Sequence, residues 1–192
     1  MKGTTSSGSP TLAGSPSARP PGLEELVSAI RSIVSRQDDW QRTARLVADE
    51  LERHLPSVDV LTPEQRRGDD DRYRSHLLHA EPGGTFSIVA LVWRPGQVTA
   101  IHDHVTWCVF GVLQGVEHEE LFRLDRELGC LVEAGENTNE TGDVTGFAPP
   151  GDIHRVRNVG DGTAISIHVY GTDVSRIGSS VRRYYDQPVV AA

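Results

Sequence analysis

The sequence is poor in cysteine, methionine and aromatic residues: its 192 residues include two cysteines and one methionine, and 6% are aromatic. Cys108 and Cys130 are too few for a disulfide framework, and a chain of this length buries enough surface to fold without one. Positive charge is also in deficit, because 27 acidic residues against 19 basic ones give a formal net charge of −8. This balance argues against binding to nucleic acids or anionic membranes.

Long apolar runs are missing as well. No stretch approaches the roughly 20 residues of a membrane span, and Lys2 is not followed by the apolar segment of a signal peptide. We therefore expect a cytoplasmic protein. Its expected partner is a small molecule, and its expected assembly is a monomer or a small homo-oligomer.

The first 22 residues differ in composition from the rest of the chain. Residues 1–22 consist mostly of Gly, Ser, Thr, Pro and Ala, which cannot offset the entropy of ordering by apolar burial. We predict a disordered tail over 1–22 and a single globular domain over 23–192.

Two amphipathic helices are predicted within about 23–55. Apolar residues recur at helical spacing from Leu23 to Val34, and a second stripe runs from Trp40 to Leu51. Asp38 or Asp39 can cap the second helix, which should end before Pro56. Both helices are expected to cover one face of another layer.

That layer is predicted to be a β-structure within about 73–185. The strand-like segments are 86–93, 109–113, 119–124 and 165–170, separated by turn residues. This order indicates a mainly β fold, an antiparallel barrel or sandwich with an N-terminal helical layer. The charged segment 66–72 is expected to be a solvated loop, and Cys130 is expected to lie in a loop.

Three histidines have the spacing of metal ligands. In a strand, His102 and His104 point to the same side, about 7 Å apart at Cα. His154 follows a turn at 149–152, from which it can swing toward the same point. Neutral imidazoles suit Fe, Zn, Cu or Ni; the alternative is that these are histidines with ordinary hydrogen bonds.

The surroundings of these histidines resemble the two signature blocks of the cupin superfamily. The matching residues are Gly96, His102, His104 and Gly115 in the first block, and Pro149, Gly151, His154 and Asn158 in the second. The resemblance implies a double-stranded β-helix barrel in which the three histidines bind a metal. One position departs, because Cys108 stands where cupins have an acidic ligand.

The same departure is typical of thiol dioxygenases. The segments VWRPGQVTAIHDHVTWCVFGVLQG, GDIHRVRN and AISIHVYG resemble the cysteine and 3-mercaptopropionate dioxygenases, over roughly 73–184. The resemblance implies Fe(II), dioxygen as co-substrate, and a relay of Ser166, His168 and Tyr170 beside the metal. These three residues also share one strand face by alternation, although that face alone could equally be exposed to solvent.

The chemistry of such a site favours a thiol substrate. Three neutral histidines leave the charge of Fe(II) uncompensated, and a thiol that coordinates the cation loses its proton. A glutamate at position 108 would occupy the place that the thiolate needs. We expect oxidation of cysteine or a related small thiol to a sulfinic acid.

The segment expected to anchor the substrate departs from the family. The family places an Arg or Gln two residues after a tyrosine, whereas this chain has Tyr73 followed by Ser75. Serine cannot form the bidentate ion pair that an arginine makes with a carboxylate. Either His76 or Arg74 substitutes for the missing anchor, or the substrate differs. The resemblance to the mercaptopropionate dioxygenases implies a second anchor, an arginine near the end of the chain, for which Arg183 is the candidate. Ordinary surface charge is the alternative for these arginines.

Cys108 has a second expected role. In animal cysteine dioxygenases, a cysteine at this place forms a thioether with the tyrosine that matches Tyr170. Cys108 shares the strand parity of His102 and His104, so it should face the barrel interior. The alternative is a reduced Cys108 packed near Tyr170.

Three other functions compete with sulfinate formation. An iron cupin could convert cysteine further, to a sulfonate, a sulfonamide or a decarboxylated product. A zinc or nickel cupin could act as a hydrolase or isomerase and would consume no dioxygen. A non-catalytic module could bind metal and a small molecule without turnover.

Overall fold

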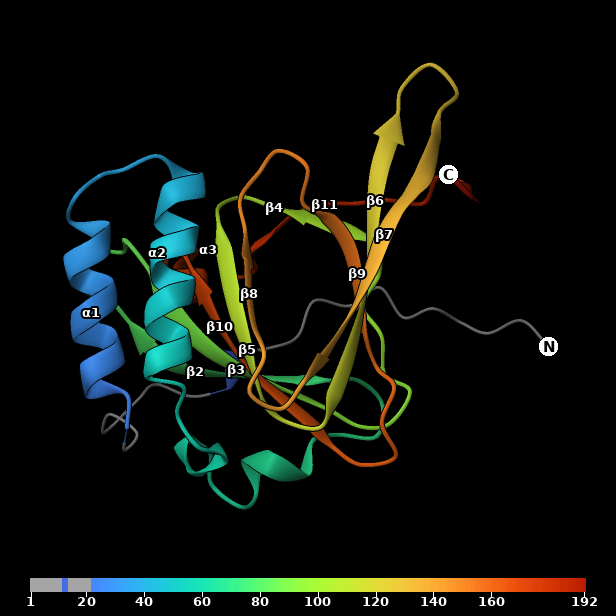
Figure 1. The fold of residues 1–192 in the computed structure, drawn as a ribbon. Helices are drawn as coiled ribbons and strands as arrows, with labels where there is room; N and C mark the ends of the chain where they lie inside the picture. Colours follow the sequence, from blue (N-terminus) through green and yellow to red (C-terminus); the bar gives the residue numbers. More distant parts are fainter. Residues whose placement is uncertain (1–11, 14–21) are drawn as a thin grey trace.

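The computed structural model describes residues 12–13 and 22–192, which form two facing β-sheets flanked by helices (Figure 1). The tail expected over 1–22 therefore lies almost wholly outside the described residues. The exceptions are Gly22 and strand β1 (Leu12–Ala13), which pairs in parallel with β2 (Arg74–Ala80). Among the described residues, no helix is long and apolar enough to cross a membrane.

Each sheet has six strands. The first has the order β1-β2-β3-β10-β5-β8 and adds β3 (Ser87–Trp93), β10 (Ala164–Tyr170), β5 (Cys108–Gln114) and β8 (Val144–Phe147). The second has the order β11-β4-β9-β6-β7-β12, with bounds Val181–Tyr184, His102–His104, Ile153–Asn158, Val116–Asp125, Cys130–Glu140 and Val189–Val190. The two sheets face each other and form a mainly β barrel, which confirms the fold class predicted from the sequence.

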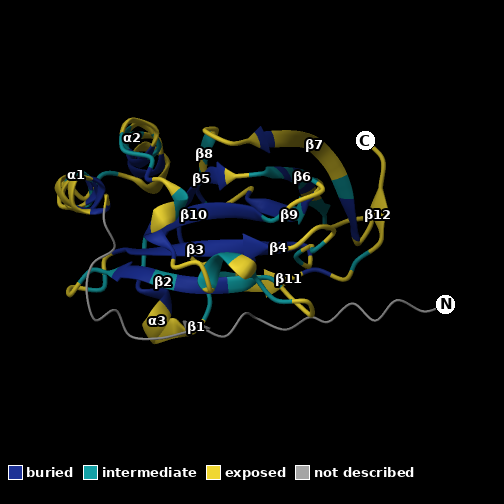
Figure 2. Ribbon diagram, turned by 90° about the horizontal axis from the view of Figure 1, so that it is seen from below, coloured by how far each residue is buried: buried dark blue, intermediate teal, exposed yellow. Residues whose placement is uncertain are grey.

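In the described part of the chain, five helical segments accompany the sheets. They are α1 (Glu24–Val34), α2 (Trp40–Arg53), the 3₁₀ turns η1 (Val58–Val60) and η2 (Gln65–Arg67), and α3 (Val174–Ile177). The Asp39 carboxylate caps α2 by accepting a hydrogen bond of 2.9 Å from the Arg42 backbone N–H. The two predicted helices are confirmed, and both lie outside the barrel (Figure 2).

The helical layer packs on the outer face of the first sheet. Leu26, Ile30, Val47 and Leu51 of the helices join one apolar cluster with alternate residues of β3, β5 and β10. A Cβ on Gly111 of β5 would lie 3.4 Å from Leu51 Cδ2 of α2 and 2.7 Å from Cδ1 of Leu55, which follows the end of α2. This contact buries the apolar face of the sheet.

Strand β10 lies between β3 and β5 and is buried on both faces. Ile165, Ile167 and Val169 pack under the helices, and burial of each such side chain contributes about 1.5–3 kcal/mol. Because strand side chains alternate, Ser166 and His168 must point into the barrel. The predicted polar face therefore lines the interior, and the alternative that it faces solvent is wrong.

The structure corrects two details of the predicted strands. Cys130 does not lie in a loop, because it is buried at the start of β7. This strand pairs with β6 along its whole length, but residues 133–140 are mostly polar and therefore gave no strand pattern in the sequence. The segment after Tyr73 is a strand, β2, rather than only an anchor motif. The predicted strands over 86–93, 109–113, 119–124 and 165–170 are confirmed by β3, β5, β6 and β10.

Gly171, directly after β10, is a point of very close packing. A Cβ at this position would lie 2.2 Å from Trp107 Nε1 and 2.6 Å from Thr106 Oγ1. The Gly171 N–H also donates to the Trp107 carbonyl at 3.1 Å. Because Gly171 has no side chain, the segment before Cys108 can pack directly against the end of β10.

We predict that Gly171→Ala lowers the free energy of unfolding by about 1–3 kcal/mol, because the new methyl group overpacks the contact with Trp107. Urea unfolding followed by fluorescence measures this change. Gly162→Ala is the matched control, since no atom lies within 4 Å of the Cβ that it adds. Equal unfolding midpoints for the two variants would contradict the prediction.

Candidate active site

Three histidines meet at one end of the barrel interior. His102 and His104 lie on β4, and His154 on the neighbouring strand β9 is the register partner of His102. The ring centroids are 4.6–5.0 Å apart, and their possible ligand atoms lie within 4.8 Å of one another. Strand pairing thus brings together the three histidines that the sequence identified as candidate metal ligands.

Each histidine has one ring nitrogen engaged by an acceptor. His102 Nδ1 lies 2.9 Å from the Ala100 carbonyl, His104 Nδ1 lies 3.2 Å from Asp152 Oδ2, and His154 Nδ1 lies 2.6 Å from Glu119 Oε1. These acceptors place the proton on Nδ1 and leave the lone pair on Nε2. His154 Nε2 is buried and has no hydrogen-bond partner, so the set fits a metal ion.

The site favours neutral imidazoles. Burial, reinforced by the neighbouring histidines, holds the pKa of His102 well below its usual value. Burial lowers the pKa of His104 to about 4, although Asp152 opposes this shift. Neutral rings are the form that binds a metal ion.

Glu119 and Asp152 orient the histidines, and the sequence reasoning did not identify them. Burial alone would raise the pKa of Glu119, but its interaction with His154 outweighs burial and lowers it. Asp152 also accepts a hydrogen bond of 2.8 Å from the His104 backbone N–H. The available signal was their position: Asp152 stands two residues before His154, and Glu119 begins a predicted strand.

Ser166, His168 and Tyr170 form a continuous line along β10. Ser166 Oγ lies 3.0 Å from His168 Nε2, and the Tyr170 hydroxyl lies 3.4 Å from His168 Nδ1. Burial lowers the pKa of His168 to about 3 and raises that of Tyr170 well above its usual value. Both groups are therefore neutral, and the Tyr170 hydroxyl keeps its proton. The Tyr170 ring stacks with the His104 ring, with the two centroids 6.1 Å apart.

Cys108 faces the pocket as predicted. It is the register partner of Tyr170, and its Sγ lies 3.9 Å from His168 Nδ1. Burial raises the pKa of this thiol well above its usual value, and both cysteines are free thiols. The thioether with Tyr170 stays a prediction.

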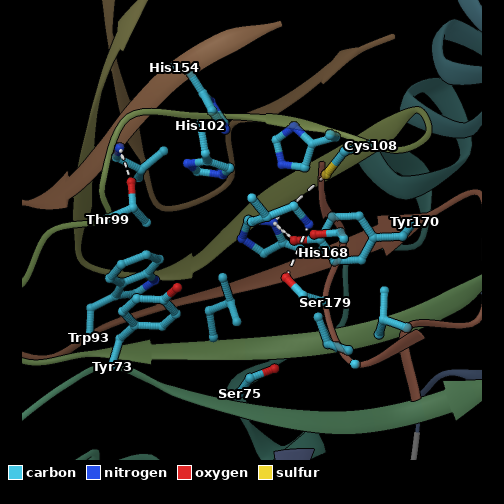
Figure 3. Close-up of a pocket in the computed structure, with 18 residues that line it drawn as sticks. Tyr73, Ser75, Trp93, Thr99, His102, Cys108, His154, His168, Tyr170 and Ser179 are labelled. Carbon is cyan, nitrogen blue, oxygen red and sulfur yellow. Dashed lines mark hydrogen bonds between the residues drawn. The ribbon is translucent and has the colours of Figure 1, made fainter. Parts of the chain in front are cut away.

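These groups open onto a cavity of about 70 Å³. Its far wall is formed by Tyr73, Trp93 and Ser75, with the Tyr73 and Trp93 rings stacked at 4.2 Å (Figure 3). The other lining side chains are aliphatic or carry a hydroxyl, and no lysine or arginine is among the described residues that line it. The pocket is therefore small, and the described residues of its lining include no carboxylate and no cationic side chain.

Two of the expected substrate anchors lie elsewhere. His76 is on the opposite face of β2 from Ser75, with Nδ1 3.5 Å from Gln65 Nε2. Arg183 donates to Asp103 Oδ2 at 2.8 Å. His76 does not line the cavity because neighbouring side chains of β2 point to opposite faces. Arg183 does not line it because its guanidinium is bound to the buried Asp103 carboxylate.

Asp103 fastens strand β11 beside the site, a role that the sequence reasoning missed. It is fully buried between His102 and His104, and its Oδ2 accepts hydrogen bonds from Arg182, Arg183 and the Tyr185 hydroxyl. Burial alone would raise its pKa, but these donors lower it. The carboxylate therefore holds β11 against β4, next to the pocket-lining residues 178–181.

Comparison with solved structures gives cupins of low similarity. A cupin 2 conserved barrel domain protein from Salinispora arenicola is 22% identical, with a TM-score of 0.40 over 57% of this chain and 82% of that chain. Recombinant oxalate oxidase in complex with glycolate is 16% identical, with a TM-score of 0.43 over 58% of this chain and 64% of that chain.

Curated relatives are more informative. The chain is 27% identical to cysteine dioxygenase type 1 of Danio rerio over 152 residues, which cover 77% of this chain and 64% of that protein. It is 30% identical to cysteine dioxygenase type 1 of Rattus norvegicus over 105 residues, which cover 53% of this chain and 52% of that protein. The matched part thus spans between half and two thirds of these relatives.

The family model of cysteine dioxygenase type I matches residues 42–184. This range includes the three histidines, Cys108 and the whole of β10. Because the match extends over more than half of the chain, this chain belongs to the cysteine dioxygenase type I family.

Proposed function

We propose that this chain is an Fe(II)-dependent dioxygenase that adds dioxygen to the sulfur of cysteine or a closely related small thiol and releases a sulfinic acid. The main observation in support is the convergence of three buried histidines, without a carboxylate in the cluster, on a small pocket. Membership of the cysteine dioxygenase type I family supports the same reaction class.

The residues present suit an iron ion bound through Nε2 of His102, His104 and His154. When bound, Fe(II) supplies the positive charge that deprotonates a coordinating thiol and the redox capacity that dioxygen chemistry needs. Glu119 and Asp152 orient the ligand rings and increase their basicity. An additional anionic ligand from the substrate is favoured because the three histidines carry no negative charge.

The remaining residues position the reactants. Tyr170 holds a proton that its hydroxyl can donate into the pocket, and His168 fixes the orientation of that hydroxyl. The aliphatic side chains Val89, Leu91 and Val156 exclude water from the wall. Ser75 and Tyr73 face the part of a small thiol that lies away from its sulfur.

A second candidate is the further conversion of cysteine to a sulfonate, a sulfonamide or a decarboxylated product. It is favoured by the absence of a cationic side chain among the described residues of the wall, which leaves a substrate carboxylate without an ion-pair partner. The mass of the product formed from cysteine in air distinguishes this reaction from simple sulfinate formation.

His154→Ala is expected to remove most of the bound iron and to abolish dioxygen consumption with thiols, because two ligands remain and the orientation by Glu119 is lost. Iron per chain after anaerobic loading, and oxygen-electrode traces with a thiol panel, measure the two effects. His118→Ala is the control, since His118 lies on β6 outside the pocket lining. A His154→Ala protein with a full equivalent of iron and normal turnover would refute the ligand assignment.

Glu119→Gln should weaken iron binding by about 10- to 100-fold, since the amide still accepts from His154 Nδ1–H but no longer carries the negative charge. Competition with a chelator of known affinity measures the change. Glu136→Gln removes an exposed carboxylate from the neighbouring strand β7 and should leave iron affinity unchanged. Equal affinities for Glu119→Gln and the unmodified protein would exclude this orienting role.

Ser75→Arg should raise kcat/KM for cysteine by about 10- to 100-fold, because a charge-assisted hydrogen bond to the carboxylate is worth about 1.5–3 kcal/mol. Initial rates of dioxygen consumption measure the change. Cysteamine, which has the same thiol and amine but no carboxylate, is the control substrate and should not benefit. An unchanged KM for cysteine with a lower kcat would show that the carboxylate does not point toward position 75.

A further inference from the structure

A second buried glutamate, Glu117, stands two residues before Glu119 on the same face of β6. Its side chain is fully buried, and neither carboxylate oxygen has a hydrogen-bond partner. No part of the proposed reaction uses this group. Burying a carboxyl group without a hydrogen-bond partner costs folding free energy, most of all when the group is ionised. The groups around Glu117 therefore decide which protonation state it adopts.

The surroundings of Glu117 favour a carboxyl that titrates near neutral pH. Its register partners on β7 and β9 are the uncharged Asn139 and Asn158. Burial raises the pKa of Glu117 to about 7, the Ser166 hydroxyl opposes this shift, and the charge of Glu119 adds to it. The group of β10 that acts on Glu117 is the Ser166 hydroxyl, and the next group along β10 is the neutral ring of His168.

Ser166 connects Glu117 to the line that ends at Tyr170. Its hydroxyl accepts a hydrogen bond of 3.4 Å from Trp93 Nε1 and lies 3.0 Å from His168 Nε2. A hydroxyl has one proton and two lone pairs. With one lone pair taken by Trp93, the Ser166 proton can go either to His168 or to Glu117.

We propose that the protonation state of Glu117 sets the direction of the hydrogen bonds along Ser166, His168 and Tyr170. When Glu117 is protonated, it donates to Ser166, Ser166 donates to His168 Nε2, and His168 Nδ1–H donates to the Tyr170 oxygen. The Tyr170 proton is then free to point into the pocket.

When Glu117 is ionised, every hydrogen bond in the line reverses. Ser166 donates to the carboxylate, His168 Nε2–H donates to Ser166, and the Tyr170 hydroxyl donates to His168 Nδ1. The Tyr170 proton then no longer points into the pocket. Glu117 is therefore a positioning residue that acts through Ser166 and His168, and its effect on turnover rests on the proposed function.

The pH dependence of turnover gives the first test. In the unmodified protein, kcat should fall on the alkaline side with a midpoint near pH 7, by about tenfold per pH unit above it. Glu117→Gln should remove this fall, because the amide stays uncharged and can donate to Ser166. Glu120→Gln is the matched control: Glu120 pairs with Arg155 and Arg157, which lower its pKa to about 2, so its loss should leave the profile unchanged.

The tautomer of His168 gives a second test that does not depend on turnover. Nitrogen-15 NMR of the full chain, metal-free and zinc-loaded, reports which ring nitrogen carries the proton. We expect the Nδ1–H form below pH 6 and the Nε2–H form above pH 8, with Glu117→Gln fixed in the Nδ1–H form. Glu120→Gln should titrate like the unmodified protein.

The two tests separate the inference from the proposed function. A His168 tautomer that does not change between pH 6 and 8, or that changes identically in Glu117→Gln, overturns the inference whatever the activity. Absence of thiol oxidation in the iron-loaded unmodified protein refutes the proposed function, while the tautomer measurement still decides the role of Glu117.

Discussion

The packing of α1 and α2 on the outer face of the first sheet determines which side chains line the pocket. Because this face is buried under the helices, the period of two in β3, β5 and β10 sends every other residue into the barrel. Cys108, His168 and Tyr170 consequently share the interior. A shift of one residue in β10 would exchange this line for three apolar side chains.

The pocket also shows how one strand face gives two carboxyl groups opposite properties. Glu119 meets His154 and has a lowered pKa, whereas Glu117, two residues away, meets a hydroxyl and uncharged amides and has a raised one. The difference comes from the partners rather than from depth, since both side chains are almost fully buried. One group is suited to orienting a metal ligand, the other to holding a proton near neutral pH.

Periodicity in the sequence predicted the helices and the mainly β barrel. The spacing of His102, His104 and His154, together with the resemblance to a known family, predicted the histidine cluster. The sequence did not predict where charged side chains find partners across the sheet. Arg183 was a candidate anchor, but it binds Asp103, and the acceptors for the histidine Nδ1 atoms come from residues up to 48 positions away. Such pairings depend on register and on which strand is adjacent, and a single sequence records neither.

The far wall of the pocket and the histidine cluster belong to different sheets. Tyr73 directly precedes β2 of the first sheet and Ser75 lies on it, whereas the three histidines come from β4 and β9 in the second sheet. Substitutions at the wall therefore leave the pairing of His102 with His154 untouched. During evolutionary divergence, a barrel built in this way can change the residues of its far wall while it keeps the histidine cluster unchanged.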